Sequence, residues 1–255
     1  MTCRDVAFYV STVACYVSPC WSEQKTGVSG AKRATVVIDP RNKQFIRGYV
    51  HLAIIFGEML KPPAMYPRYL INLKEAFNRW TKVNVLLESP CRIDSPRFLE
   101  MPVIYLTTYD IFDLTPPERD NIRQFFDNGG FMVLDNARPT LGLSDQEASL
   151  KRLLFDALGE NARLGPIPLS HPIYHVFFDL IEGAPPGVGR GTPVFEQFYI
   201  TGVWDEDRLV AVLSNRGYTI FMNDTIDNEP QLRFGVNMVL YGLMYGGKQA
   251  KNDKN

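Results

Sequence analysis

Cysteine is scarce in this chain: the 255 residues contain four, Cys3, Cys15, Cys20 and Cys91. No two of them form a Cys-x-x-Cys pair, which excludes a disulfide framework and a zinc knuckle as the basis of the fold. No cysteine or serine stands in a Gly-x-Cys-x-Gly or Gly-x-Ser-x-Gly elbow, the turn that presents the nucleophile of amidotransferases and α/β-hydrolases. We therefore interpret Cys91, which follows "ESP", as a structural residue, and we expect no amidotransferase activity.

An excess of positive charge is also absent. The chain has 27 Lys and Arg against 28 Asp and Glu, so its formal net charge is -1. Nucleic-acid binding needs a basic surface that neutralises phosphates, and this balance makes nucleic acid a poor candidate partner. No apolar run reaches the ~20 residues of a membrane-spanning helix. With 45% hydrophobic residues, the composition predicts a globular domain without a transmembrane span.

The first 44 residues differ in composition from the rest. The apolar "VAFYVSTVACYV" follows Arg4 and precedes the polar "SPCWSEQKTGVSG", a pattern typical of a secretory signal peptide. Asp5 beside the apolar run argues against that interpretation. Two alternatives stay open: a periplasmic or exported protein, or a cytoplasmic protein with a poorly ordered leader. The expected organisation is a leader and linker over residues 1–44, one α/β domain over 45–247 and a disordered tail over 248–255.

A strand-helix-strand unit stands at the centre of the chain. "PVIYLTT" (102–108) is a continuous apolar run, typical of a strand that is covered on both faces. "DLTPPERDNIRQFFDNGG" (113–130) predicts a helix that begins after Thr115, carries Glu118 as in a capping box, and ends at Gly129 in the left-handed conformation. "FMVLD" follows as a second buried strand. A connection of this kind is a right-handed parallel crossover.

The other segments extend this pattern. Helices are expected over 70–83, 145–159 and 231–246, a first strand over 45–57, and a hairpin over 195–215 with "DED" at its turn. Alternating strands and helices predict an α/β fold. We expect a mostly parallel sheet with helices on both faces and an antiparallel hairpin at one edge.

The order of several motifs resembles one protein family. The motifs are "YPRYLINLKEAFNRWTKVNV", "FLEMPVIYLTTYDIFDLTPPERDNIRQFFDNGGFMVLDN", "HPIYH", "DEDRLVAVLSN" and "FGVNMVLYGLMYG", within residues 45–246. In this order they resemble the bacterial domain-of-unknown-function family numbered 4159. The resemblance implies a flavodoxin-like, class I glutamine-amidotransferase-like three-layer sandwich. It also implies an exported or membrane-associated setting, with MoxR-type ATPases or von Willebrand factor A domain proteins as partners.

No activity is established for that family, so the resemblance carries no catalytic role to this chain. The chain also departs from the family pattern. Met65 stands before Tyr66, where an acidic residue is common, and Thr108-Tyr109 replaces a common Gly-His pair. These positions are strand exits, where ligands bind in this architecture. The departures weigh against a retained ancestral site.

Polar side chains gather where the two central strands are predicted to end. They are Thr107, Thr108, Tyr109, Asp110, Asp135 and Asn136. In a catalytic interpretation Asp135 is a general base, and Asn136 donates to an oxyanion or a sugar hydroxyl. In a structural interpretation, which we favour, an Asx pair after a strand builds a turn on its own backbone. Asp110 can likewise cap the turn that follows it.

His171, His175 and Arg208 complete the candidate crevice. A spacing of four aligns two histidines on a helix face, but Pro172 between them argues for a turn, so no metal site is predicted. The alternatives are that the histidines orient a loop and that Arg208 forms a surface ion pair. "GVGRG" (187–191) neither follows a strand nor precedes a helix, so we expect no phosphate-binding loop and predict no cofactor.

Two functions are compatible with these patterns. The favoured one is a non-catalytic binding or scaffold domain of a bacterial envelope or ATPase-linked assembly, which predicts a specific protein partner. The alternative is a hydrolase-like enzyme or small-ligand binder that uses Asp135, Asp110, Tyr109 and a histidine. This second function predicts that those groups converge within hydrogen-bond reach.

Overall fold

The structure is a computed structural model that describes residues 9–10, 13–14, 33–37, 42–159, 162–188 and 198–246. Its strands are β1 (Tyr9–Val10), β2 (Val13–Ala14), β3 (Ala34–Val37), β4 (Arg47–Leu52), β5 (Ile55–Phe56), β6 (Lys82–Leu87), β7 (Cys91–Arg92), β8 (Val103–Thr108), β9 (Phe131–Asn136), β10 (Ala162–Gly165), β11 (Ile200–Asp205) and β12 (Arg208–Ser214). Its α-helices are α1 (Tyr69–Trp80), α2 (Pro116–Asp127), α3 (Asp145–Leu158), α4 (Tyr218–Asn223) and α5 (Glu229–Tyr245). Short 3-10 helices cover Lys43–Phe45, Pro96–Glu100 and Pro172–Tyr174.

The central sheet has the strand order β10-β11-β12-β9-β8. β8, β9 and β12 run parallel, and β11 and β10 extend the sheet with two antiparallel pairings. α2 connects β8 to β9, as the central strand-helix-strand pattern predicted. Every residue of β8 and β9 is buried. This explains why both strands read as continuous apolar runs rather than as alternating patterns.

A second sheet has the order β1-β2-β3-β4-β6. β4 is parallel to β6 and antiparallel to β3. Beyond these strands the chain continues into the short parallel pair β5 and β7, and β5 contacts β8 of the central sheet. Buried residues of this second sheet pack into the same core as α1 and α5.

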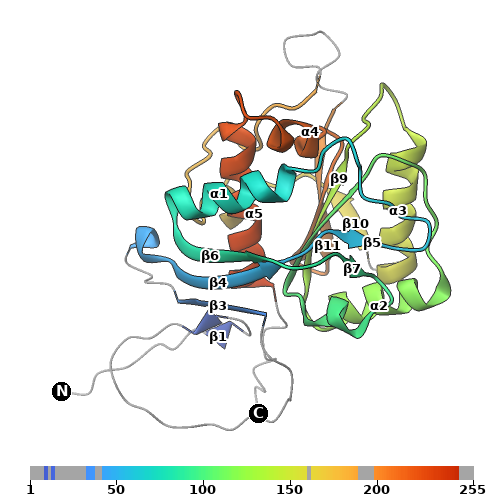
Figure 1. Cartoon of the computed structure of the whole chain (residues 1–255), viewed down its shortest axis with the longest axis horizontal. Helices are drawn as coiled ribbons and strands as arrows, with labels where there is room; N and C mark the ends of the chain where they lie inside the picture. The colour runs from blue at the N-terminus through green and yellow to red at the C-terminus, as the bar shows by residue number, and fades with distance from the viewer. Residues whose placement is uncertain are drawn as a thin grey trace, which may run out of the picture.

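Helices cover both faces of the central sheet (Figure 1). α1 and α5 lie on one face, and α2 and α3 lie on the other. The two faces enclose separate cores because successive side chains of a strand point to opposite sides. Val133 of β9 packs with Phe77 and Phe234 in one core, whereas its neighbour Leu134 packs with Phe125 in the other.

Local capping groups set the ends of the helices. At the start of α2, the backbone N–H of Thr115 donates to Glu118 Oε2 at 2.8 Å. After α2, Gly129 has a φ of 87°, a left-handed conformation that glycine adopts without steric cost. Ser144 caps α3 by accepting the N–H of Glu147 at 3.2 Å, and Gly159 follows α3 with a φ of 65°. The predicted ends of both helices are confirmed.

Two features of the fold differ from the expectation. The sheets are mixed rather than mostly parallel: among the described strands, five pairings are parallel and four are antiparallel. The physical reason is that β3 and β10 add antiparallel partners outside the parallel core. The second difference is α4, a six-residue helix that was not predicted. Its sequence "YTIFMN" is rich in aromatic and β-branched residues, which favour strands in isolation.

Candidate functional site

The parallel strands of the central sheet end side by side. In the register of the sheet, Thr107 of β8 pairs with Asp135 of β9, and Thr108 pairs with Asn136. Ser214 of β12 pairs with Asp135 from the other side. The structure therefore brings together Thr107, Thr108, Asp135 and Asn136, and all of them are buried.

Asp135 contacts the N-terminus of α4. Its Oδ1 accepts the backbone N–H of Tyr218 at 3.1 Å, and its Oδ2 accepts that of Thr219 at 2.7 Å. Gly217, with a φ of 64°, precedes these residues. The first N–H groups of a helix have no partner within the helix, so Asp135 supplies the acceptors that α4 lacks.

The protonation of Asp135 depends on this environment. Burial raises its pKa above that of an ordinary aspartate, and hydrogen bonds from Thr219, Ser214 and Tyr218 oppose that effect. The Thr219 hydroxyl also donates to Thr107 Oγ1 at 2.9 Å. Asp135 has no solvent-accessible surface, whereas a general base must reach the proton that it removes. The arrangement stabilises α4 and presents no open carboxylate.

Asn136 connects three segments through its side-chain amide. Its Nδ2 donates to Ser144 Oγ at 3.0 Å and to Asn215 Oδ1 at 2.8 Å. Its Oδ1 accepts the N–H of Arg138 at 2.9 Å, which forms an Asx turn. Both donors of the amide are thus used inside the protein. The Nδ2 of Asn215, by contrast, is buried without a hydrogen-bond partner among the described residues.

Tyr109 marks the boundary between this buried network and the surface. The preceding Thr108 donates its hydroxyl to the carbonyl of Asp110 at 2.6 Å, and Asp110 is exposed. The half-buried Tyr109 ring lies 6.3 Å from the ring of Tyr66. The guanidinium of Arg138 lies 5.2 Å from the centre of the same ring, a cation–π contact. Three loops, after β5, β8 and β9, supply these side chains.

Arg208 lies at the opposite edge of the sheet, which corrects the expectation of a single crevice. It is the first residue of β12, whereas Ser214 beside Asp135 is the last. Six steps of about 3.3 Å along the extended strand separate the two positions by about 20 Å. Arg208 donates to the carbonyl of Phe126 at 3.3 Å and to Asp205 at 3.4 Å. Arg208 therefore lies beside the hairpin turn and not at the carboxyl-terminal edge near Asp135.

His171 packs near the same hairpin. Its ring lies 5.4 Å from that of Trp204 on β11 and 5.2 Å from that of Tyr241 on α5. Its Nδ1 accepts the N–H of Ile173 at 3.3 Å. Burial among these aromatic rings lowers the pKa of the imidazole below that of an ordinary histidine. Trp204 pairs with Leu209 near the start of β12, whereas Asp135 pairs with Ser214 at its end, so His171 lies away from Asp135.

His175 makes contacts different from those of His171. Its Nε2 hydrogen-bonds the carbonyl of Leu169 at 2.7 Å, and its Nδ1 lies 3.4 Å from Asp179. Asp179 in turn pairs with Lys43 at 2.6 Å. Within the ranges that the structure describes, no group of three or more His, Cys, Asp or Glu side chains is arranged to hold a metal ion.

Part of the "GVGRG" segment can be placed. A Cβ on Gly187 would come within 2.1 Å of the carbonyl oxygen of Arg216, so the backbones approach closely there. The N–H of Val188 donates to that same carbonyl at 3.0 Å. The described amide is thus used by the protein itself. Residues 189–191 of the motif lie outside the described residues.

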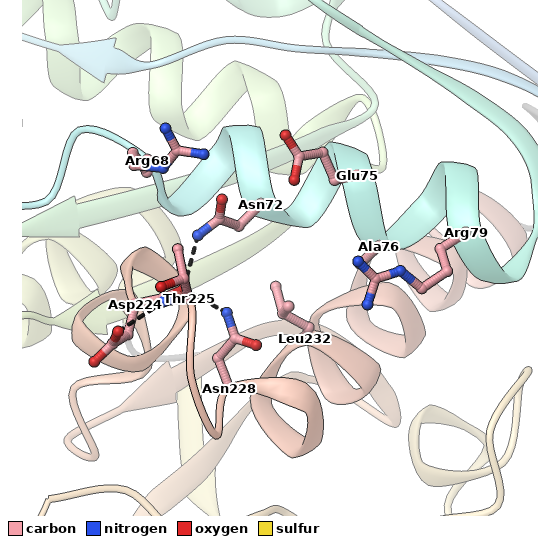
Figure 2. A pocket seen from close by; sticks show the side chains of 9 residues that line it. All are labelled: Arg68, Asn72, Glu75, Ala76, Arg79, Asp224, Thr225, Asn228 and Leu232. Carbon is pink, nitrogen blue, oxygen red and sulfur yellow. Dashed lines mark hydrogen bonds between the residues drawn. The ribbon is translucent and has the colours of Figure 1, made fainter.

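A small pocket lies between α1 and the segment that joins α4 to α5 (Figure 2). Its volume is about 180 Å³, and it is lined by Arg68, Asn72, Glu75, Ala76, Arg79, Asp224, Thr225, Asn228 and Leu232. Asn72 donates to the carbonyl oxygens of Met222 and Asp224 at 2.7 and 2.9 Å. None of the predicted site residues lines this pocket. Its charges have both signs, so it does not favour an anion or a cation.

Sequence reasoning missed three residues that matter at the carboxyl-terminal edge. Tyr218 and Thr219 contribute backbone N–H groups, which no side-chain motif reveals. Arg138 stands two residues after Asn136, the position whose N–H an Asx turn binds. The sequence could have predicted that turn. It could not have predicted the contact with Tyr109, because Tyr109 belongs to another loop.

A protein-family model matches most of this chain. The family described as "Domain of unknown function (DUF4159)" matches residues 62–243, which is more than half of the chain. No curated protein matches this sequence. In the described part of the chain, no helix is both long and apolar enough to cross a membrane.

Proposed function

This chain belongs to the DUF4159 family, and we propose that its domain is a non-catalytic binding module. The main support for the proposal is that Asp135 is buried and fully hydrogen-bonded within the protein. Both carboxylate oxygens accept backbone N–H groups of α4, and the residue is fully buried. A catalytic carboxylate must instead have access to substrate.

The other groups of an enzyme-like crevice do not support catalysis either. The side-chain amide of Asn136 donates both of its hydrogen bonds within the protein, to Ser144 and Asn215. His171 contacts Trp204 and Tyr241, far from Asp135. The surface at the carboxyl-terminal edge includes Tyr66, Tyr109 and Arg138, residue types that are common in protein interfaces. These observations favour binding of a partner over turnover of a substrate.

We also propose that the parallel core has a flavodoxin-like arrangement of strands. β9 lies between β8 and β12, all three are parallel, and the parallel β5 and β7 adjoin β8 through β5. This neighbourhood supports the strand order 2-1-3-4-5 of flavodoxin-like folds. In such folds the loops after the strands form the binding edge, and here these loops carry Tyr66, Tyr109 and Arg138.

We further propose that the partner is a MoxR-type ATPase or a von Willebrand factor A domain protein, in an envelope or ATPase-linked assembly. The resemblance of the motifs to the family supports this choice. A direct test is isothermal titration calorimetry of the purified chain against both proteins from the same organism. The expected result is saturable binding to one of them, at a Kd in the micromolar range or tighter.

A thermal-shift screen with divalent metals, nucleotides, sugars and amino acids tests the competing small-ligand function. A ligand at a hundredfold excess over its Kd adds about 2.7 kcal/mol of stability. The binding-module proposal predicts no such shift that depends on the carboxyl-terminal edge. Stabilisation that is lost in both Tyr109→Ala and Asp110→Asn, combined with no binding to either protein, would refute it. Both residues are at least partly exposed, so these variants should stay folded.

A further inference from the structure

Three loops at the carboxyl-terminal edge form one continuous aromatic and cationic surface. Tyr66 follows β5, Tyr109 follows β8 and Arg138 follows β9. The two rings are 6.3 Å apart, and the guanidinium lies 5.2 Å from the Tyr109 ring. We refer to Tyr66, Tyr109 and Arg138 as the edge platform. The half-buried rings are held in place, so little side-chain entropy remains to be lost on binding.

Arg138 is the residue of the edge platform that can bind a negatively charged group. It is exposed, and it forms no ion pair with any residue that the structure describes. Its contact with Tyr109 is a cation–π contact with the ring, which does not occupy the guanidinium N–H groups as hydrogen-bond donors. An arginine in this state can bind a carboxylate through two parallel hydrogen bonds.

Exposed apolar side chains lie close in sequence to the residues of the edge platform. Met65, Ile111 and Leu141 belong to the same three loops and are 62%, 55% and 57% exposed. Large apolar side chains that gather around polar ones at a surface are typical of an interaction site. Tyrosine, methionine and arginine are also the residue types that are enriched in protein interfaces.

The free charges of these loops have a positive balance. Arg68 and Arg138 are exposed without an ion pair among the described residues, whereas Asp110 is the corresponding free carboxylate. The nearby carboxylates of Asp113 and Glu58 are paired with Arg152 and Arg92. A partner with negative charge therefore complements this edge.

Resting on the proposed binding function, we infer that the edge platform is the docking site for a peptide segment of a protein partner. The segment presents an Asp or Glu carboxylate to Arg138. A neighbouring apolar side chain of the segment packs on Tyr66 and Tyr109, beside the exposed apolar residues. The carboxylate supplies specificity and the apolar contact supplies most of the buried area.

The test uses the purified full chain and random 12-residue peptides displayed on phage as the probe. Peptides are selected on the wild type and counter-selected on Arg138→Gln. Synthetic copies are then measured by fluorescence anisotropy against the wild type, Arg138→Gln, Arg138→Lys and Tyr109→Ala. Arg123→Gln on α2 is the matched control, because it also removes one exposed arginine. Thermal melts confirm that each variant is folded.

The expected peptides contain Asp or Glu next to an apolar residue. Their affinity should fall about tenfold to a hundredfold in Arg138→Gln, as for the loss of a charge-assisted hydrogen bond. Arg138→Lys should also bind more weakly, because lysine lacks the planar, forked donor group. Affinity should fall as salt rises and should be unchanged in Arg123→Gln.

Each other outcome overturns the inference in a recognisable way. Peptides that bind equally well to Arg138→Gln and Tyr109→Ala would place the docking site elsewhere, while the binding-module function would stand. Peptides that need Tyr109 but contain no carboxylate would overturn the acidic partner class. Failure to enrich any peptide would overturn the docking site as a peptide binder, and the titrations with the two partner proteins would decide the proposed function separately.

Discussion

The carboxylate of Asp135 accepts the backbone N–H of Thr219 at 2.7 Å, across 84 residues of sequence. This contact ties the end of β9 to the first turn of α4. It gives a buried acidic residue a structural role at the strand position where enzymes of this architecture often place a catalytic group. The consequences for stability can be measured.

Asp135→Ala should destabilise the fold by about 2–3 kcal/mol, because it leaves the buried N–H groups of Tyr218 and Thr219 without acceptors. Urea denaturation followed by circular dichroism measures this loss. Asp110→Ala is the matched control: Asp110 is exposed, so its removal should change stability by less than about 0.5 kcal/mol. Equal effects in the two variants would contradict the capping role.

Asn72→Ala should cost about 1–3 kcal/mol, because the carbonyls of Met222 and Asp224 lose their side-chain donor. Asn78 on the same helix is exposed and provides the comparison. Asn78→Ala should be neutral or slightly stabilising, since alanine is the better helix former. The two free energies of unfolding are compared directly, and a loss in Asn78→Ala as large as that in Asn72→Ala would point to helix propensity instead.

Gly242→Ala should destabilise the protein although alanine favours helices. A Cβ at Gly242 would lie 2.7 Å from side-chain atoms of both Phe131 and Val103. Overpacking of this kind costs about 1–3 kcal/mol, against about 1 kcal/mol gained in helix propensity. Gly235→Ala should cost less, because its nearest atom is the end of the flexible Met222 side chain at 2.8 Å. Thermal melts of both variants test this order, and the reverse order would be inconsistent with close packing of α5 on the sheet.

His171 should make stability depend on pH. Burial lowers its pKa in the folded protein below the ordinary value of 6.5, so the unfolded chain binds a proton more readily. The stability that the neutral ring provides is therefore fully present above pH 6.5 and is lost as the pH falls through the folded pKa. Free energies of unfolding from pH 8 to pH 5 should show a steeper fall in the wild type than in His171→Gln. Parallel curves for the two proteins would exclude this assignment.

Local sequence signals were sufficient for most of the helices. Thr115, Glu118 and Gly129 predicted both ends of α2, because capping groups and left-handed glycines act within a few residues of the helix that they delimit. The continuous apolar runs of β8 and β9 likewise predicted buried parallel strands. These features follow from short-range geometry and from burial, both of which leave a periodic pattern in the sequence.

The candidate site depended on contacts between distant segments. The sequence by itself determined that Asp135 and Asn136 stand at a strand end, beside Thr107 and Thr108 on the neighbouring strand. Only the tertiary structure decided that Asp135 binds amides of α4, and that Arg208 lies at the far edge with the hairpin turn. The physical reason is that backbone N–H groups are the same in every residue except proline. Which of them reaches a buried carboxylate is decided by how the chain packs.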